Sequence, residues 1–364
     1  MTKRILFVGD LAPHCRTFQR YRALCDLGFD VRDVSSSPTG YVPGVTPESF
    51  WYKVFFKLRR PLDLTDANRK MVENARQFPP DVVWVERALM IRPESLRRIR
   101  ECADRPVTLL SYSEDDMFAP HNQSVWYRRC LPLFDAVFTT KSYNCEPGEL
   151  PALGARRVLF VDKAYDRYEH RPLALTAEEL ARYSADAAFV GTFEAERAGL
   201  LLRLAVEGIE VRVWGNGWRA WMGRHPRLRV ENRPVYGDEY AKVLCATKIN
   251  LCFLRKINRD LQTDRTMELP ACGAFMLAER TSEHLRLFEE GAEADYFNVS
   301  DPSEMIAKVR YYLANDEERR AVAAAGRRRA LHSGYSHHHR LRWMLQQVQA
   351  MPDVSAREEA TCPR

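Results

Sequence analysis

The stretch from Asn258 to Arg280 combines charged side chains with helix signals in a way that suits anion binding. A polar loop leaves the apolar run 248–254. Thr263 or Asp264 can then cap a helix that begins near Arg265. Free N–H groups and the macrodipole at a helix N-terminus attract anions. The pattern therefore predicts that this arginine binds a diphosphate.

Two acids of the same stretch, Asp260 and Glu268, lie eight positions apart. Glu268, one turn into the expected helix, could accept hydrogen bonds from two adjacent hydroxyl groups, as a ribose presents them. Pro270 and Gly273 close the helix before the next strand. The alternative is a capping aspartate with a solvated surface carboxylate, which would take no part in binding.

Two further turns follow strands of the C-terminal half. In GTFEAER, Gly191 permits close backbone approach and Thr192 can cap a helix, so Arg197 could meet a phosphate. In WGNGW, the glycine turn could border a base or a diphosphate, with Asn216 and Trp218 in contact with it. A tight turn with a solvated arginine, and an ordinary turn at a strand end, are the respective alternatives.

Four segments, FVGTFEAER, VRVWGNGW, RTMELPACGAFMLAE and LFEEGAEADYF, resemble in order and spacing the C-terminal domain of GT-B glycosyltransferases. The resemblance covers about Ala185 to Leu345 and is to the CgeB-like branch, with a C-terminal domain of the glycosyl transferases group 1 type. It implies a nucleotide-sugar donor and chemistry that needs no metal ion.

The resemblance also implies roles for single residues. In retaining families of that fold the second acid of an acid-x7-acid pair binds the nucleotide ribose, which would be Glu268. The first acid lies near the transferred sugar; it would be Asp260, although those families usually have Glu there. Arg265 and Arg197 would meet the diphosphate, and Tyr236 lies where this fold reads the base. The candidate donor-site residues are Arg265, Glu268, Arg197, Gly191, Thr192, Asn216, Gly217, Trp218, Tyr236, Asp264 and Thr266.

The densest polar cluster of the N-terminal half is SYSEDDMFAPHNQS, which follows the expected strand 107–113. Paired carboxylates there could supply a general base for an acceptor hydroxyl, because like charge or burial raises one pKa. They could also bind a divalent metal, and a capping and turn cluster is the alternative. The candidates are the catalytic Asp115 and Asp116, with Glu114, His121 and Asn122 on the acceptor side. His14, in the loop GDLAPHCRTFQR, is a further candidate base.

Composition limits the class of protein. A chain of 364 residues exceeds the size at which one core usually stays single, so two domains are expected. Nine cysteines, an odd number without metal-ligand spacing, indicate a reducing compartment. A net charge of +6 suits an anionic substrate or surface, but no aromatic-interleaved basic stripe predicts nucleic-acid binding. No apolar run approaches the ~20 residues that span a bilayer.

Short apolar runs alternate with helical patterns along the whole chain, which predicts parallel sheets built from βαβ units. The expected strands are 4–10, 29–35, 81–87, 107–113, 135–141 and 157–163, then 186–192, 209–216, 228–235, 248–254, 274–279 and 294–300. We therefore expect an α/β protein of GT-B type, with two Rossmann-like domains facing a central cleft. The expected parts are an acceptor-binding domain (1–165), a linker (166–184), a nucleotide-sugar-binding domain (185–335) and a last helix, about 336–351, that packs back on the first domain.

The segment FWYKVFFKLRR, residues 50–60, mixes aromatic with basic side chains. It could dock on a membrane surface or on a lipid-linked acceptor, and a buried amphipathic helix is the alternative.

Together these features predict a glycosyltransferase that moves a sugar from a nucleotide sugar to a hydroxyl group of a glycan, a lipid-linked or a small-molecule acceptor. The predicted location is cytoplasmic or at the inner face of the membrane. Retention and inversion both stay open: the acid-x7-acid spacing favours the first, and a base at Asp115 or Asp116 would favour the second. The alternatives are a nucleotide-sugar epimerase or hydrolase on the same fold, and a sugar-binding protein without enzymatic activity.

Overall fold

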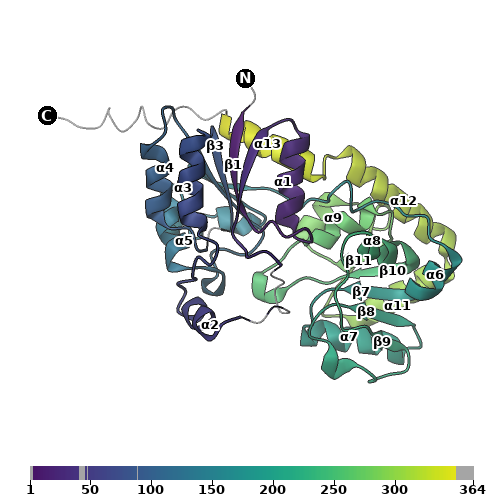
Figure 1. The fold of residues 1–364 in the computed structure, drawn as a ribbon. Coiled ribbons are helices and arrows are strands. Elements are labelled where there is room, and N and C mark those ends of the chain that lie inside the picture. Colours follow the sequence, from purple (N-terminus) through teal and green to yellow (C-terminus); the bar gives the residue numbers. More distant parts are fainter. Residues whose placement is uncertain (1–2, 41–45, 47, 88, 350–364) are drawn as a thin grey trace. The chain divides into compact units, whose positions relative to one another are not determined.

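The computed structural model describes residues 3–40, 46, 48–87 and 89–349 (Figure 1). The residues divide into two units, each with its own core. The first unit contains the residues up to Val161 together with those from His338 onward, and the second contains Asp162–His337.

The first unit is built on a parallel sheet of six strands in the order β2-β1-β3-β4-β5-β6. The strands are β1 (Arg4–Gly9), β2 (Asp30–Ser35), β3 (Val82–Glu86), β4 (Thr108–Ser113), β5 (Ala136–Thr139) and β6 (Val158–Phe160). All six lie where the apolar runs predicted strands.

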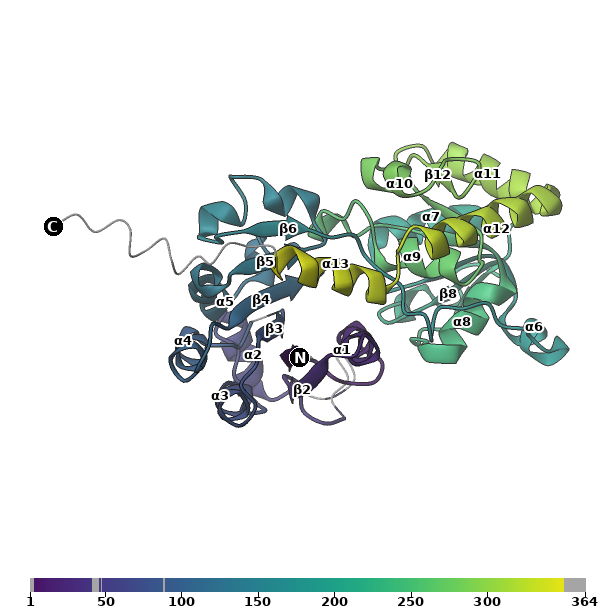
Figure 2. The ribbon, with the colours of Figure 1, turned by 90° about the horizontal axis from the view of Figure 1, so that it is seen from above.

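Helices cover both faces of this sheet, as a parallel sheet requires. The helices of this unit are α1 (Arg16–Asp26), α2 (Phe50–Lys57), α3 (Ala67–Gln77), α4 (Pro93–Glu101), α5 (Val125–Cys130) and α13 (His337–Gln349), with 3-10 turns η1 (Pro120–Asn122), η2 (Leu131–Leu133), η3 (Ser142–Cys145) and η4 (Pro151–Leu153). All of these α-helices except α2 contribute buried residues to the core of the unit. Alternate strand residues point to opposite faces: Leu6 packs with α3, α4 and α5, whereas Phe7 packs with α1 and α13. Figure 2 shows α3, α4 and α5 on one side of the strands and α1 and α13 on the other. The C-terminal helix α13 contributes Leu341 and Met344 to this second layer.

The second unit repeats the architecture with the strand order β12-β11-β10-β7-β8-β9. Its strands are β7 (Ala185–Val190), β8 (Val211–Trp214), β9 (Leu228–Val230), β10 (Thr247–Cys252), β11 (Met276–Glu279) and β12 (Asp295–Phe297). Its helices are α6 (Ala177–Tyr183), α7 (Ala195–Val206), α8 (Gly237–Ala246), α9 (Asp264–Ala271), α10 (Ser282–Leu287), α11 (Pro302–Ala314) and α12 (Asp316–His332), with η5 (Arg219–Trp221) and η6 (Lys256–Asn258). The predicted pair of Rossmann-like sheets is confirmed.

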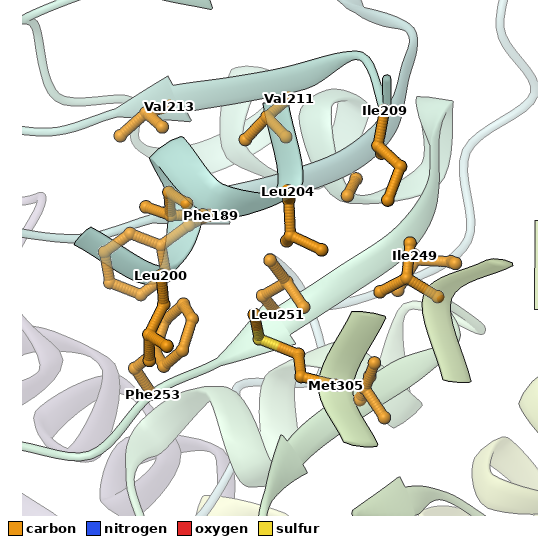
Figure 3. Close-up of a cluster of buried hydrophobic side chains, with 14 of the residues drawn as sticks. Phe189, Leu200, Leu204, Ile209, Val211, Val213, Ile249, Leu251, Phe253 and Met305 are labelled. Atoms are coloured by element: carbon orange, nitrogen blue, oxygen red, sulfur yellow. The ribbon is translucent and has the colours of Figure 1, made fainter. Parts of the chain in front are cut away.

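Apolar residues of α7 and α11 fill one side of the second sheet. Figure 3 shows Phe189 of β7 and Leu251 of β10 in one cluster with Leu204 of α7 and Met305 of α11. Helices α8, α9 and α10 pack on the opposite side, in a cluster that includes Met267 and Met276. Both faces of the sheet are thus buried, and its carboxyl edge is the place where polar side chains gather.

The segment 166–184, expected to be a linker, is instead folded as part of the second unit. Asp166 accepts hydrogen bonds from the N–H groups of Tyr168 and Glu169, at 2.8 and 2.9 Å. Helix α6 begins with a capping box between Thr176 and Glu179 and ends with Tyr183, which packs beside Trp214. A charge-rich composition with a proline does not distinguish a linker from such a capped, partly packed segment.

Within the ranges that the structure describes, no helix is long and apolar enough to cross a membrane. The eight cysteines in those ranges are all free, and Cys130, Cys252 and Cys272 are buried.

A substitution at Leu204 tests whether α7 packs in the core of the second unit as described. Its side chain is fully buried in the cluster beneath β7 and β10, so Leu204→Ala should lower the free energy of unfolding by about 2–5 kcal/mol. Val206 lies on the same helix but is 64% exposed, and Val206→Ala should change stability by less than about 0.5 kcal/mol. Urea denaturation followed by circular dichroism measures both variants. Equal effects would mean that α7 does not pack as described.

Candidate functional site

The second sheet has a topological switch point between β7 and β10. The chain runs from β7 to β8 and β9 on one side, and then crosses through α8 to β10 on the other side of β7. Strands β7 and β10 are paired in parallel, so their carboxyl ends lie next to each other while the following segments leave in opposite directions. Open α/β sheets bind ligands at such a point.

Two arginines predicted to bind phosphate meet at this point. Arg265, in the first turn of α9, donates from Nη1 to the carbonyl oxygen of Val190 at 3.0 Å and from Nη2 to that of Phe253 at 3.2 Å. Arg197, in the first turn of α7, donates to the carbonyl oxygens of Thr192 and Leu254, at 3.3 and 3.1 Å. Each guanidinium group therefore bridges the chain that leaves β7 and the chain that leaves β10.

The two guanidinium groups also share one aromatic ring. The Cζ atoms of Arg197 and Arg265 lie 5.2 and 5.1 Å from the centroid of the Phe189 ring. Burial lowers the pKa of Arg197, and the positive charge of Arg265 lowers it further, while Glu194, 2.7 Å away, acts in the opposite direction. Among the described residues, the buried Nε of Arg265 has no hydrogen-bond acceptor. An anion at this place would offset the repulsion between the two charges and satisfy a buried donor.

Beside the arginines, the loops after β7 and β8 approach each other through their backbone. A Cβ atom on Gly215 would lie 2.0 Å from the carbonyl oxygen of Gly191, and one on Gly191 would lie 2.6 Å from Cζ of Phe189. Only glycine permits this approach of the two loops. Asn216 takes part through its carbonyl oxygen, which accepts from the N–H of Phe193 at 3.0 Å.

The expectation that Trp218 contacts a base is wrong. Its side chain is fully buried, and its Nε1 donates to the carbonyl oxygen of Gly191 at 2.8 Å. The indole therefore supports the loop after β7 from behind. The capping role of Thr192 is also wrong, because α7 begins at Ala195 and Thr192 is exposed in the loop before it. Gly217 is exposed in the turn with φ +86°, and its contact with a donor stays a prediction.

Helix α9 begins at Asp264, close to the predicted start, but its polar residues are bound internally. The backbone N–H of Thr263 donates to Oγ1 of Thr266 at 3.0 Å, and the same Oγ1 lies 2.8 Å from Nε2 of His284. Thr266 is fully buried by these contacts, so its hydroxyl is not available to a donor, contrary to the prediction. Asp264 forms an ion pair with Lys163 at 3.3 Å.

His284 fixes this network through one tautomer. Its Nδ1 lies 2.6 Å from the carbonyl oxygen of Glu279, which can only accept, so Nδ1 carries the proton and Nε2 accepts from Thr266. Burial lowers the pKa of His284 to about 4. A neutral imidazole thus holds the start of α9 at neutral pH.

Glu268 lies one turn further into α9 and is almost completely buried. Its Oε2 accepts from the hydroxyl of Tyr240 at 2.6 Å, and its Oε1 lies 3.7 Å from Nε2 of His170. Neither Tyr240 nor His170 was predicted, since His170 lies in the segment read as a linker and Tyr240 in the middle of a helix. The ribose role of Glu268 stays a prediction.

Two further donor candidates lie at strand ends. Asp260, in the loop from β10 to α9, accepts from Nδ2 of Asn258 at 2.8 Å and from the N–H of Arg255 at 3.4 Å. Tyr236 is the N-cap residue of α8, and its side chain is 46% exposed. Their proposed contacts with a sugar and a base are untested.

In the first unit, the polar segment SYSEDDMFAPHNQS forms mainly turns after β4. Asp116 is fully buried and accepts hydrogen bonds from the N–H of Phe118 at 3.2 Å and from Nδ2 of Asn144 at 2.9 Å. The prediction that Asp116 is the catalytic base is therefore wrong, because a buried carboxylate does not reach an acceptor hydroxyl. Asn122 is buried too, donating to the carbonyl oxygen of Asp116 at 3.0 Å, so it is not an acceptor contact. Asp115 lies 3.2 Å from the guanidinium group of Arg87.

A network of ion pairs lies at the switch point of this unit, between β1 and β3, and includes the candidate Glu114. Arg20 of α1 donates to both carboxylate oxygens of Glu86, each at 2.8 Å, and to Oε1 of Glu114 at 2.9 Å. The sequence did not identify the contact between Arg20 and Glu86, because it joins residues 66 positions apart. His14 lies half-buried in the loop after β1, and His121 is exposed. Of the acidic cluster, Glu114 belongs to this network through its hydrogen bond from Arg20.

Metal ligands are not grouped anywhere in the described ranges: no three His, Cys, Asp or Glu side chains there could hold an ion together. Three histidines follow one another at 337–339, and Nε2 of one of them, His338, lies 2.9 Å from the carboxylate of Asp26.

A family described as glycosyl transferase-like matches residues 197–346, a range that includes Arg197 and Arg265. No curated protein matches the sequence. Among solved structures, the chain is similar to sucrose-phosphate synthase from Thermosynechococcus elongatus, with 13% identity and a TM-score of 0.63 over 96% of this chain and 99% of that one. It is similar to Alr3699/HepE from Anabaena in complex with UDP and glucose, with 11% identity and a TM-score of 0.61 over 96% and 100% of the two chains.

A third similar structure is an alpha-glucosyltransferase in complex with UDP and a 13-mer DNA containing an HMU base. Its identity is 12% and its TM-score 0.68, over 96% of this chain and 100% of that chain. At identities this low the likeness shows the fold, which is GT-B. This fold and the glycosyl transferase-like match over residues 197–346 define the class of protein, which is that of the glycosyltransferases.

The neutral state of His284 predicts a pH dependence of stability. Because the folded-state pKa lies near 4 and an unfolded histidine titrates near 6.5, the unfolded chain binds more protons in this window. Stability from this residue is complete above the unfolded pKa and falls as the pH drops toward 4. The free-energy advantage of the wild type over His284→Asn should therefore shrink by about 2–3 kcal/mol between about pH 7 and about pH 4.5.

Urea unfolding at both pH values measures the effect. His332→Asn, an exposed site on α12, is the matched control and should follow the wild type throughout. If the His284→Asn difference were the same at both pH values, the imidazole would not be held neutral by the α9 contacts.

Proposed function

We propose that the second unit binds the nucleotide-sugar donor with its diphosphate on Arg265 and Arg197. The observation that carries this proposal is the pair of guanidinium groups across the carboxyl ends of β7 and β10, with a buried Nε of Arg265 that lacks an acceptor among the described residues. Two of the similar structures contain UDP, which makes UDP the first nucleotide to test.

The chemistry of transfer explains why positive charge belongs there. The acceptor oxygen forms a bond to the anomeric carbon and loses its proton to a base, while the bond from that carbon to the diphosphate oxygen breaks. The diphosphate leaves with the bonding electron pair, so its negative charge increases along the reaction. Two fixed cations at this position stabilise the transition state more than the ground state.

Other parts of the donor site follow from the CgeB-like resemblance. Glu268 would bind the ribose hydroxyls, with Tyr240 orienting its carboxylate, and Asp260 would lie near the transferred sugar. In the first unit, Asp115 is the carboxylate proposed to activate the acceptor, with Glu114 on the acceptor side, because Asp116 is buried in a turn. The configuration of the product, determined by NMR, distinguishes retention from inversion.

The acceptor is proposed to be a hydroxyl group of a glycan, a lipid-linked or a small molecule, and the location to be cytoplasmic. The free cysteines support a reducing compartment. An epimerase or hydrolase on the same fold would convert the donor without any acceptor. A donor-only assay that yields a new sugar or free sugar at the full rate would favour that alternative.

The arginine pair is tested by nucleotide binding. Arg265→Ala and Arg197→Ala each remove charge-assisted hydrogen bonds worth about 1.5–3 kcal/mol, so the Kd for UDP should rise roughly 10- to 150-fold in isothermal titration. Arg203→Ala, at an exposed position of the same helix as Arg197, should bind UDP like the wild type.

Each variant must keep the circular dichroism spectrum of the wild type. Arg265→Lys keeps the charge but cannot bridge two carbonyl oxygens, so it should recover only part of the affinity. Unchanged UDP affinity in both alanine variants would place the diphosphate elsewhere.

The reaction is expected to need no metal ion. Addition of EDTA to the complete assay should leave the initial rate within about twofold of the untreated rate, because the arginines rather than a metal ion neutralise the leaving group. Activity lost in EDTA and restored by Mg²⁺ or Mn²⁺ would contradict this expectation.

A further inference from the structure

Helix α2 of the first unit is well formed yet buries none of its side chains. Ser49 caps it by accepting from the N–H of Tyr52 at 3.1 Å. Just after the helix, the carbonyl oxygen of Arg59 accepts from the N–H of Val125 at 2.8 Å, which ties the chain to α5. No residue from Ser49 to Arg60 is buried, contrary to the alternative of a buried amphipathic helix. The helix is therefore held in place without filling the core.

Its exposed residues are large and apolar. Phe50 is 71% exposed, Trp51 65%, Leu58 61% and Phe56 45%. The Phe50 and Trp51 rings lie 5.6 Å apart, and the Tyr52 and Phe56 rings 6.1 Å apart, so the aromatic groups contact each other at the surface. Isolated exposed apolar residues need no explanation, but a contiguous group of this kind marks a binding surface.

The same segment carries only positive charge. Lys53, Lys57, Arg59 and Arg60 are all exposed, and no Asp or Glu occurs between Phe50 and Arg60. The two lysines lie one turn apart, on one face of the helix. The eight exposed residues of this segment form what we call the α2 surface: Phe50, Trp51, Lys53, Phe56, Lys57, Leu58, Arg59 and Arg60.

This composition favours a lipid surface over a protein partner. The cores of protein interfaces are depleted of lysine, whereas an anionic bilayer attracts each Lys or Arg near it by about 1 kcal/mol. Trp, Tyr and Phe rings sit well at the level of the lipid headgroups. We propose that the α2 surface binds the headgroup region of anionic phospholipid membranes, with α2 lying in the plane of the interface.

The position of α2 in the first unit connects this contact with the acceptor. The chain leaves the sheet at the carboxyl end of β2 and returns there after α2, where the hydroxyl of Thr65 donates to the carbonyl oxygen of Ser35 at 2.9 Å. Figure 1 shows α2 apart from the helices that cover the sheet of this unit. Glu114 follows β4 at the same carboxyl edge. Provided that the proposed transfer is correct, membrane contact would favour a lipid-linked acceptor.

Vesicle binding tests the proposal directly. The full-length protein is sedimented with vesicles of phosphatidylcholine alone and with vesicles of phosphatidylcholine and phosphatidylglycerol in equal parts. Binding should occur to the mixed vesicles and weaken steeply as salt is raised, because the basic residues are screened. Binding should be much weaker to phosphatidylcholine alone.

Two double variants separate the contributions of charge and apolar contact. Lys53→Gln with Lys57→Gln should reduce partitioning onto mixed vesicles about 25-fold, at about fivefold for each charge. Phe50→Ser with Trp51→Ser should reduce it about tenfold or more. Lys70→Glu on α3 and Trp343→Ser on α13 change exposed residues of the same unit outside the α2 surface, and both should bind like the wild type.

Three results would overturn the proposal: no binding to mixed vesicles, equal binding to both vesicle types, or a concentration-dependent dimer that the same double variants abolish. The last would mean that a second copy covers the α2 surface. UDP affinity of the α2 variants should equal that of the wild type, so a failure of membrane binding and a failure of the donor site are measured separately.

Discussion

The proposed donor site depends on two guanidinium groups that backbone carbonyl oxygens hold at the switch point of the second sheet, between β7 and β10. Arg265 and Arg197 each bridge the chain after β7 and the chain after β10. The carbonyl groups, and Glu194 at 2.7 Å from Arg197, offset part of the repulsion between the two cations. The GT-B fold supplies this arrangement, because β7 and β10 end side by side and helices α7 and α9 begin just beyond them.

Much of the polar chemistry around this pair supports the backbone rather than a ligand. Thr266 and His284 fix the start of α9, and Trp218 fixes the loop after β7. Asp116 does the same for a turn in the first unit. These residues resemble site residues in the sequence, because the types that bind ligands also cap helices and satisfy buried backbone groups. In the folded structure their polar groups are taken up by hydrogen bonds within the unit.

The two units differ in the side chains that they expose. In the second unit, polar groups lie at the carboxyl edge of a sheet whose two faces are packed with apolar residues. The first unit carries, besides its own buried Arg20–Glu86 pair, a helix whose aromatic and basic residues remain exposed. An amphipathic sequence pattern alone does not reveal whether such a helix covers a core or a membrane, since both favour apolar residues at helical spacing.

From the sequence by itself, the twelve strands, the two-unit α/β architecture and the start of α9 could be predicted, because apolar periodicity and caps act over a few neighbouring residues. The position of polar residues just after expected strands also identified Arg265 and Arg197 as candidates for binding a diphosphate. Only the tertiary structure decided that the two arginines share the ring of Phe189, that Tyr240 contacts Glu268, and that Asp116 and Trp218 are buried. Most of those contacts join residues tens of positions apart, and no local pattern encodes which distant side chain a residue will meet.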